Sequence, residues 1–167
     1  GNSGGFAGKS TDTETYYVFN SYLNPNEIYH HDFSTGKSTL FRRPEIDFDF
    51  SGYVTKRVFY ASKDGTQIPM FLVHKKGIEL NGTNPTILYG YGGFNISLNP
   101  GFSPSILPWI EEGGVYAVAN LRGGGEEGEE WHRDGMLGKK QNVFDDFHAA
   151  AEWLIAEGWT TAEQLGI

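Results

Sequence analysis

The sequence TILYGYGGF, residues 86–94, joins a short apolar run to a glycine-rich segment. The run is bounded by proline and glycine, which is typical of a short buried parallel strand. The glycine pair 92–93 lets the backbone pass close to a ligand, and a tyrosine hydroxyl can donate a hydrogen bond to a developing oxyanion. Tyr91 and Phe94 are therefore candidate site residues. The local pattern favours equally an ordinary aromatic-rich surface loop.

The residues after this stretch predict further elements of an α/β sheet. A second buried strand is expected over 114–121, ending at the glycine-rich sequence 122–125. Apolar residues at helical spacing predict a helix over 143–157, with Asn142 as its N-cap and Gly158 just past its end. Residues 165–167 then resemble the start of another strand. The order of strand, glycine loop and helix indicates the opening half of an α/β fold.

The preceding residues predict antiparallel strands. Residues 1–14 are polar and glycine-rich and are expected to form a loop. Aromatic and β-branched runs at 15–22, 27–33 and 37–41, separated by tight turns, predict an antiparallel meander. Three strands bury little apolar surface alone, so we expect them to belong to a larger sheet or a propeller blade.

A second hairpin is expected downstream of the meander. Residues 54–61 and 67–74 flank the turn sequence 63–66, which contains Asp-Gly. An acidic connector at 44–51 separates this hairpin from the meander. The chain therefore reads as pieces of two domains rather than as one repeated unit.

The composition excludes several classes of function. A formal charge of -8 and a pI near 5.0 argue against binding to nucleic acid or to anionic membranes. The absence of cysteine excludes disulfides and cysteine-ligated metals, and it fits a cytoplasmic protein. No apolar run approaches the roughly 20 residues of a membrane span. No signal peptide is recognisable and the chain begins with Gly1, so we expect an internal segment of a longer protein.

Short motifs elsewhere in the sequence do not predict a catalytic or nucleotide-binding site. Residues 1–5, GNSGG, match G-x-S-x-G, but the strand and helix that make a nucleophile elbow are not predicted around Ser3. The sequence Gly8-Lys9-Ser10 lacks the first glycine of a phosphate-binding loop. The acidic run 126–130 is interpreted as a solvated loop.

The histidines do not predict a metal site. His30 and His31 are adjacent on a predicted strand, so their side chains point to opposite faces. His132 and His148 have no second ligand at helical spacing. We expect no metal and no other cofactor.

Several blocks of this sequence together resemble the prolyl oligopeptidase family. They are residues 62–71, 89–97, 119–126, 130–132 and 140–147. The resemblance implies a seven-bladed β-propeller combined with an α/β-hydrolase peptidase domain. Residues 1–45 would then be part of the last propeller blade, and 46–167 the N-terminal half of the hydrolase domain.

The same resemblance implies roles for the two candidate site residues. Tyr91 would donate its hydroxyl to the oxyanion, and Phe94 would line the pocket for proline. In the family the nucleophile elbow, Gly-Gly-Ser-Asn-Gly-Gly, follows a strand like 165–167, and the Asp and His come later. The triad is therefore expected beyond Ile167 and is assigned to no residue here, and Arg122 and Trp131 are expected to be structural.

The resemblance implies a serine endopeptidase that hydrolyses short peptides on the carboxyl side of proline, as a monomer when full-length. Without the triad, this chain alone is predicted to be inactive. Two alternatives stay open: an oligopeptidase that cuts after basic residues, and a non-catalytic interaction module. The block around Tyr91 and Phe94 favours the proline-specific enzyme.

Overall fold

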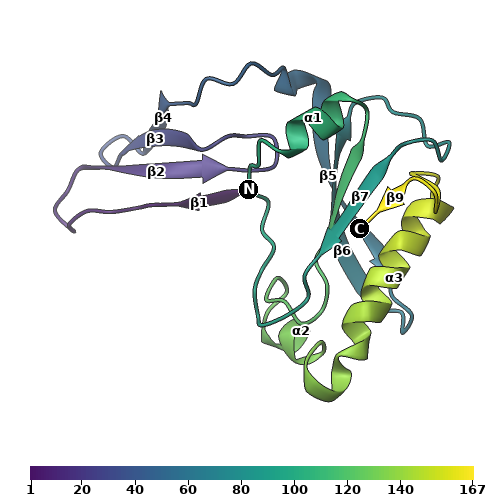
Figure 1. The fold of residues 1–167 in the computed structure, drawn as a ribbon. Coiled ribbons are helices and arrows are strands. Elements are labelled where there is room, and N and C mark those ends of the chain that lie inside the picture. Colours follow the sequence, from purple (N-terminus) through teal and green to yellow (C-terminus); the bar gives the residue numbers. More distant parts are fainter. The chain divides into compact units, whose positions relative to one another are not determined.

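The computed structural model describes residues 1–167, which divide into two compact units. The first unit comprises residues 1–50 and 99–104, and the second comprises 51–98 and 105–167. Figure 1 shows a separate β-sheet in each unit. No helix in either unit has both the length and the apolar character needed to cross a membrane.

The first unit is a four-stranded antiparallel sheet in the order β1-β2-β3-β4. Its strands are β1 (Asn2–Gly4), β2 (Glu14–Asn20), β3 (Glu27–Asp32) and β4 (Lys37–Arg42). The predicted meander is confirmed, but the prediction of a loop over 1–14 is wrong for β1. Ser3 lies exposed on β1, paired with Phe19, so the G-x-S-x-G match forms part of an edge strand.

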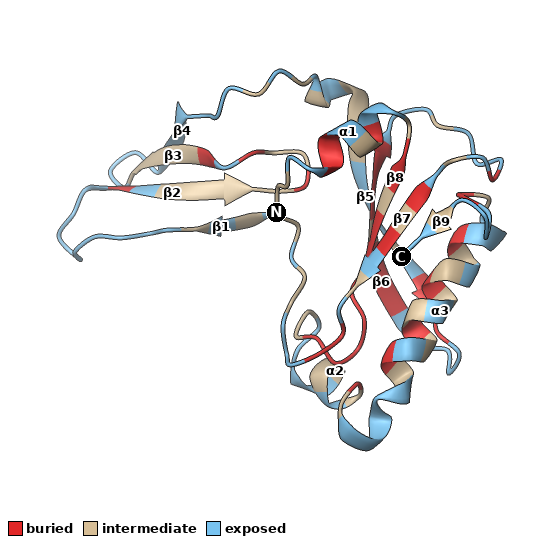
Figure 2. Cartoon of the chain, viewed as in Figure 1, coloured by how far each residue is buried: buried red, intermediate tan, exposed pale blue.

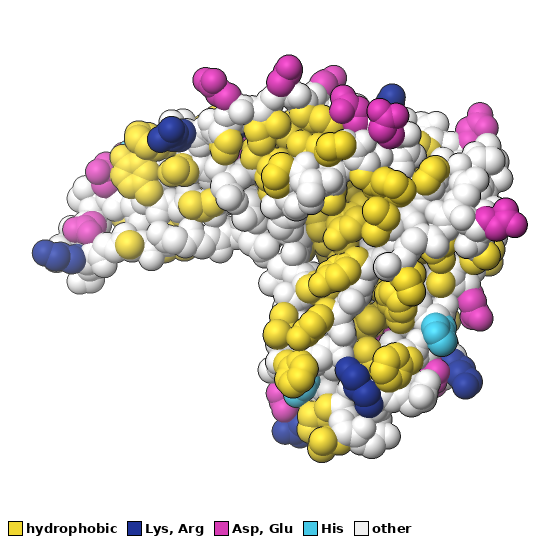
Figure 3. Space-filling view, viewed as in Figure 1, with side chains coloured by type: hydrophobic (Ala, Val, Ile, Leu, Met, Phe, Trp, Pro, Cys, Tyr) yellow, Lys and Arg dark blue, Asp and Glu magenta, His cyan; other side chains and the backbone are white.

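This first sheet buries few of its side chains (Figure 2). Within its strands only Thr15 and Glu27 are buried, and every residue of β4 is exposed. Aromatic residues instead stack along the surface, as Tyr17 does with Phe6 and with Tyr29. Exposed hydrophobic side chains are visible on this unit in Figure 3.

The second unit contains a mixed five-stranded sheet in the order β5-β6-β8-β7-β9. Its strands are β5 (Tyr53–Ala61), β6 (Gln67–Lys75), β7 (Thr86–Gly90), β8 (Val115–Ala119) and β9 (Leu165–Gly166). A short 3₁₀ turn, Phe50–Gly52, precedes β5. Strands β5, β6 and β8 pair antiparallel, whereas β8, β7 and β9 pair parallel. This confirms the predicted hairpin and the predicted parallel strands.

The helices of the second unit lie between its parallel strands in sequence. They are α1 (Ile106–Glu111), α2 (Glu129–Arg133) and α3 (Gln141–Ala156), with a 3₁₀ turn at Leu137–Lys139. The predicted long helix is α3, but it begins before Asn142, whose side chain instead donates to the carbonyl of Asp134 at 2.8 Å. Gly158 has φ +76° just past the helix end, as predicted.

The core of the second unit forms where α3 covers the sheet (Figure 1). Val143, Ala150 and Leu154 of α3 pack with alternate residues of the strands, including Met70 and Leu72. This alternation follows from the two-residue period of a strand, which places every second side chain on the same face. The sheet and α3 thereby fix the base from which the glycine-rich loops extend.

Candidate active site

The two glycine-rich loops start from neighbouring parallel strands. Gly90, the last residue of β7, pairs with Ala119, the last residue of β8. Because parallel strands place their carboxyl ends at the same edge of a sheet, the loops 91–98 and 120–128 begin side by side. Ligand sites of open α/β sheets form in crevices at this edge. The glycine-rich stretch 90–94 therefore lies where such a site is expected.

Two glycines allow these loops to approach closely. Gly92 has φ +60°, and a Cβ there would lie 2.4 Å from Val143 Cγ1. Gly123 has φ +92°, and a Cβ there would lie 2.7 Å from the carbonyl oxygen of Gly92. The backbone amide of Asn95 donates to the Gly123 carbonyl at 3.1 Å, which joins the loops directly. No larger residue fits at either position without moving the backbone.

The structure places both predicted site residues on the first loop, with their side chains accessible. Tyr91 is 44% exposed, and its hydroxyl makes no hydrogen bond within the chain. Phe94 is 85% exposed and has φ +52°, and Asn95 has φ +56°. Left-handed backbone at non-glycine residues is uncommon and costs free energy, so surrounding contacts must hold it. Exposed aromatic rings on a constrained backbone are available to a ligand.

An apolar pocket of about 560 Å³ opens beside Phe94. Phe94 lines it and Tyr91 does not, although both belong to the same loop. The lining residues are Gly93, Phe94, Gly123, His132, Gly135, Met136, Leu137 and Lys140. Of these, sequence reasoning found only Phe94 as a site residue. Gly93 belongs to the same loop as Phe94, and the other six come from the segment 123–140, which the folded chain brings next to that loop.

The side chains of His132 and Trp131 donate hydrogen bonds to backbone carbonyls of the second glycine-rich loop. Nδ1 of His132 lies 2.8 Å from the Gly123 carbonyl, so Nδ1 carries the hydrogen and donates it. The indole of Trp131 donates to the carbonyl of Leu121 at 3.1 Å. The structural role predicted for Trp131 is confirmed, and His132 acts in the same way.

Arg122 lies buried at the start of the second loop and forms an extended ion-pair network. It binds Asp146 of α3 at 2.6 Å and Asp64 of the β5–β6 turn at 2.6 Å. Asp146 is fully buried and also accepts from Ser62 at 2.6 Å. A buried guanidinium with several carboxylate partners fixes the backbone that carries it. The structural role predicted for Arg122 is therefore confirmed.

This network shifts the ionisation of its members. Hydrogen bonding to Arg122 lowers the pKa of Asp64 to about 2. Hydrogen bonding to Asp146 raises the pKa of Arg122, so the guanidinium stays charged in spite of its burial. Burial, with the nearby charge of Asp146, raises the pKa of the Tyr60 hydroxyl, which donates to the Asp146 carbonyl.

The acidic run at 126–130 is only partly solvated, which corrects the sequence interpretation. Glu127 forms an exposed ion pair with Arg57. Glu126, however, is half-buried and accepts from the backbone amide of Leu98 at 2.9 Å and from Asn120 at 3.2 Å. Asn120 also donates to the Leu98 carbonyl at 3.0 Å. Together they hold the end of the first glycine-rich loop.

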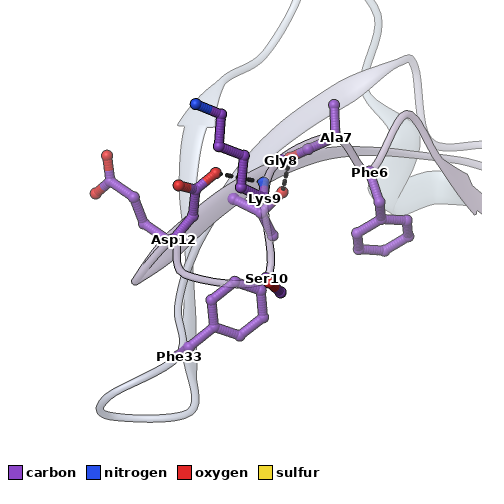
Figure 4. A pocket seen from close by; sticks show the side chains of 9 residues that line it. Phe6, Ala7, Gly8, Lys9, Ser10, Asp12 and Phe33 are labelled. Carbon is purple, nitrogen blue, oxygen red and sulfur yellow. Dashed lines mark hydrogen bonds between the residues drawn. The ribbon is translucent and has the colours of Figure 1, made fainter.

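The phosphate-loop match at Gly8-Lys9-Ser10 lies in the first unit (Figure 4). There the carboxylate of Asp12 accepts from the Lys9 amide at 2.7 Å. A neighbouring carboxylate thus already occupies the amide that an anion would use. The backbone amide and carbonyl of Lys9 in this turn are both paired within the segment itself.

The histidines of β3 have separate cross-strand partners. His30 lies 2.8 Å from Glu14, and His31 lies 2.9 Å from Ser38. No group of three or more metal-ligating side chains is assembled anywhere in the chain.

Comparison with known proteins identifies one family throughout. Residues 100–167 match the family model described as the prolyl oligopeptidase family. A prolyl endopeptidase of Elizabethkingia meningoseptica is 48% identical over the whole chain, which covers 24% of that protein. Prolyl oligopeptidase ophP of Omphalotus olearius is 44% identical over 165 residues, which is 96% of this chain and 22% of that protein. The chain thus spans about a quarter of the length of these curated relatives.

Solved structures similar to this chain belong to enzymes of the same kind. The structure of one of two prolyl endopeptidases, from a study of inter-domain dynamics in catalysis and specificity, superposes with a TM-score of 0.93 and 52% identity. The superposition includes 99% of this chain and 24% of the chain of that endopeptidase. A post-proline cleaving enzyme from Rickettsia typhi superposes with a TM-score of 0.88 and 38% identity, covering 98% of this chain and 24% of its own.

Proposed function

We propose that this chain, which belongs to the prolyl oligopeptidase family, carries the oxyanion-stabilising part of a serine endopeptidase that cleaves short peptides after proline. One observation carries the proposal. Tyr91 and Phe94 lie on a single constrained loop at the carboxyl edge of the parallel strands, beside an apolar pocket. An oxyanion donor and an apolar residue that recognises a ring are needed close together for this reaction.

In this proposal the free hydroxyl of Tyr91 donates to the oxygen of the tetrahedral intermediate. Such a donor lowers the activation barrier when the fold holds it in place before the substrate arrives. Phe94 contributes an apolar face for the proline ring, which has no side-chain donor or acceptor to recognise. The nucleophilic serine, its histidine base and the orienting aspartate are assigned to the part of the relatives' length that this chain does not span. The 167 residues alone are accordingly expected to be inactive.

The domain assignment is part of the same proposal. We assign residues 1–45 to the last blade of a β-propeller and 46–167 to the N-terminal half of an α/β-hydrolase domain. The four-stranded antiparallel sheet of the first unit supports the former, because propeller blades are sheets of this kind. The parallel strands β8, β7 and β9, with α3 packed on them, support the latter. Short peptides would be the only partners, and the full-length protein would be a cytoplasmic monomer.

The test compares two tyrosines in the full-length protein that contains this segment. Tyr91→Phe removes the proposed donor, and Tyr89→Phe removes the hydroxyl of a tyrosine two residues earlier whose side chain is as accessible, with 45% of the residue exposed against 44%. On a peptide p-nitroanilide with proline at the cleaved bond, Y91F should lower kcat by a factor on the order of 10 to 1000. Y89F should leave kcat within a factor of about 2, because hydroxyls outside the reacting centre gain nothing in the transition state.

Three outcomes separate the alternatives. Unchanged turnover in Y91F contradicts the oxyanion role. Activity only on the equivalent substrate with arginine at the cleaved bond identifies an enzyme that cuts after basic residues. Inactivity on both substrates, with no nucleophile elbow in the sequence that follows residue 167, identifies a non-catalytic binding module.

A further inference from the structure

The loop that carries Tyr91 and Phe94 is bound by a lysine from a different element. The ammonium of Lys140 donates to the carbonyl of Gly92 at 2.7 Å. Gly92 is the residue immediately after Tyr91. The two partners are separated by 48 residues in sequence, so only the folded chain brings them together.

Lys140 extends from a well-anchored position. It lies between the 3₁₀ turn and the first residue of α3. Its amide donates to the Leu137 carbonyl at 3.1 Å, and its own carbonyl accepts from Val143 at 3.1 Å. Val143 belongs to the core, so the backbone of Lys140 is tied to the most buried part of the second unit.

The loop that it contacts needs such a tether. Gly92, Phe94 and Asn95 all have left-handed φ values. For Phe94 and Asn95 this conformation is unfavourable and persists only where other contacts hold it. Besides the bond from Lys140, the amide of Asn95 is held by Gly123 and the amide of Ile96 by Gly93. Of these bonds, the one from Lys140 is nearest to Tyr91 in the chain and is charge-assisted.

The Lys140 ammonium and the Tyr91 ring lie against the same residue. A Cβ added at Gly93 would be 3.8 Å from Lys140 Nζ and 3.8 Å from Tyr91 Cε1. The ammonium also forms no ion pair with any carboxylate, whereas the neighbouring Lys139 binds Asp134 at 2.6 Å. The charge of Lys140 is therefore directed to the backbone beside Tyr91.

We propose that Lys140 is a positioning residue that holds the Gly92 peptide, and through it the Tyr91 hydroxyl, in the geometry required for oxyanion stabilisation. This inference rests on the proposed function of Tyr91 and extends it to a residue that touches no reacting atom. Without the ammonium, the Gly92 carbonyl loses the hydrogen bond that fixes its direction. A donor that has lost its fixed direction must be reoriented during the reaction, and most of its benefit is lost.

A double-mutant cycle in the full-length protein tests the coupling. Lys140→Met should lower kcat on the order of 10-fold, with KM changed less than about 3-fold, because the lost interaction acts mainly in the transition state. In the Y91F background the same K140M change should lower kcat by less than about 2-fold, since there is no hydroxyl left to position. Lys140→Arg retains the charge and the donors and should recover part of the loss.

The matched control is Lys139→Met, which removes the same charge one residue earlier. It should leave kcat unchanged, because Lys139 binds only the exposed Asp134. Hydrogen–deuterium exchange supplies a readout independent of activity. The amides of Asn95 and Ile96 should exchange on the order of 10-fold faster in K140M than in K139M, because loosening the loop exposes them.

The outcomes distinguish this inference from the proposed function. If Y91F itself leaves kcat unchanged, the proposed function fails, whatever Lys140 does. If Y91F lowers kcat but K140M lowers it by the same factor with and without Tyr91, the positioning role is wrong. Unchanged exchange at Asn95 and Ile96 in K140M would also overturn it.

Discussion

The strands of both sheets of this molecule are paired by backbone hydrogen bonds, yet only the second sheet has a hydrophobic core. Leu40 on β4 of the first sheet is 47% exposed, whereas Leu72 on β6 of the second sheet is 0% exposed. Both strands are paired by backbone hydrogen bonds. A hydrogen-bonded ladder therefore says little about burial, which requires a second layer on top of the sheet.

In the second unit that layer is α3, whose apolar stripe covers β5 to β8. On the strands of the first unit, by contrast, the aromatic side chains contact one another and none of them is buried. Because burial of apolar surface is the dominant favourable term in folding, the second unit should account for most of the stability of the chain. All four tryptophans, Trp109, Trp131, Trp153 and Trp159, lie in the second unit, so their fluorescence reports its unfolding selectively.

The largest difference in stability between the two units is expected when an ion pair is removed from each. Asp146→Ala removes a fully buried partner of Arg122 and leaves the guanidinium incompletely paired. The free energy of unfolding, followed by tryptophan fluorescence in urea, should fall by about 3 to 5 kcal/mol.

The comparison for this prediction is Glu14→Ala in the first sheet. Glu14 pairs with His30 on the surface, and its loss should change the unfolding free energy, followed by far-UV circular dichroism because that signal includes the first sheet, by less than about 1 kcal/mol. Similar effects of D146A and E14A would contradict the contrast between the two units.

A smaller difference is expected from one substitution made in both sheets. Leu72→Ala should destabilise the second unit by about 2 to 5 kcal/mol, because it leaves a cavity under α3. Leu40→Ala should cost less than about 1 kcal/mol, since its side chain is already half in water. Urea unfolding of both variants, followed by far-UV circular dichroism because that signal includes both sheets, measures the two costs. A cost for L40A equal to that for L72A would reveal a covering layer over the first sheet.

The smallest effect is expected on the dependence of folding stability on pH. The folded pKa of Asp64, about 2, lies below its ordinary value, so its ionised form stabilises the folded state. This stabilisation is present above about pH 4 and is lost as the pH falls towards 2. Because Asp64 is half exposed, we expect about 1 kcal/mol after allowance for solvent screening.

Asp64→Asn should therefore flatten the dependence of stability on pH between about 4 and 2. The control is Asp32→Asn in the first sheet, where hydrogen bonds from Ser34 lower the pKa of an exposed carboxylate. Tryptophan fluorescence should show no change in the acid unfolding of the second unit for D32N. A pH profile of D64N identical to that of the wild type would exclude the Arg122–Asp64 bond in solution.

The sequence by itself determined most of the elements and the site loop. The Asp-Gly turn at 63–66 predicted the hairpin of β5 and β6. Helical spacing of apolar residues predicted α3, because that period reflects which face of a helix is buried. The pattern around residues 86–94 predicted both the strand β7 and the loop with Tyr91 and Phe94. These are local features, encoded within a few residues.

Only the tertiary structure decided the contacts that make the loop a site. The glycine-rich segment around Ser3 became a strand because β2 offered a free edge, which no local pattern shows. The partners of Arg122 lie 24 and 58 residues away, and those of Lys140 lie 48 residues away. A hydrogen bond between distant residues depends on where the fold places both groups, so the anchors of the loop were decided by the packing of α3 on the sheet.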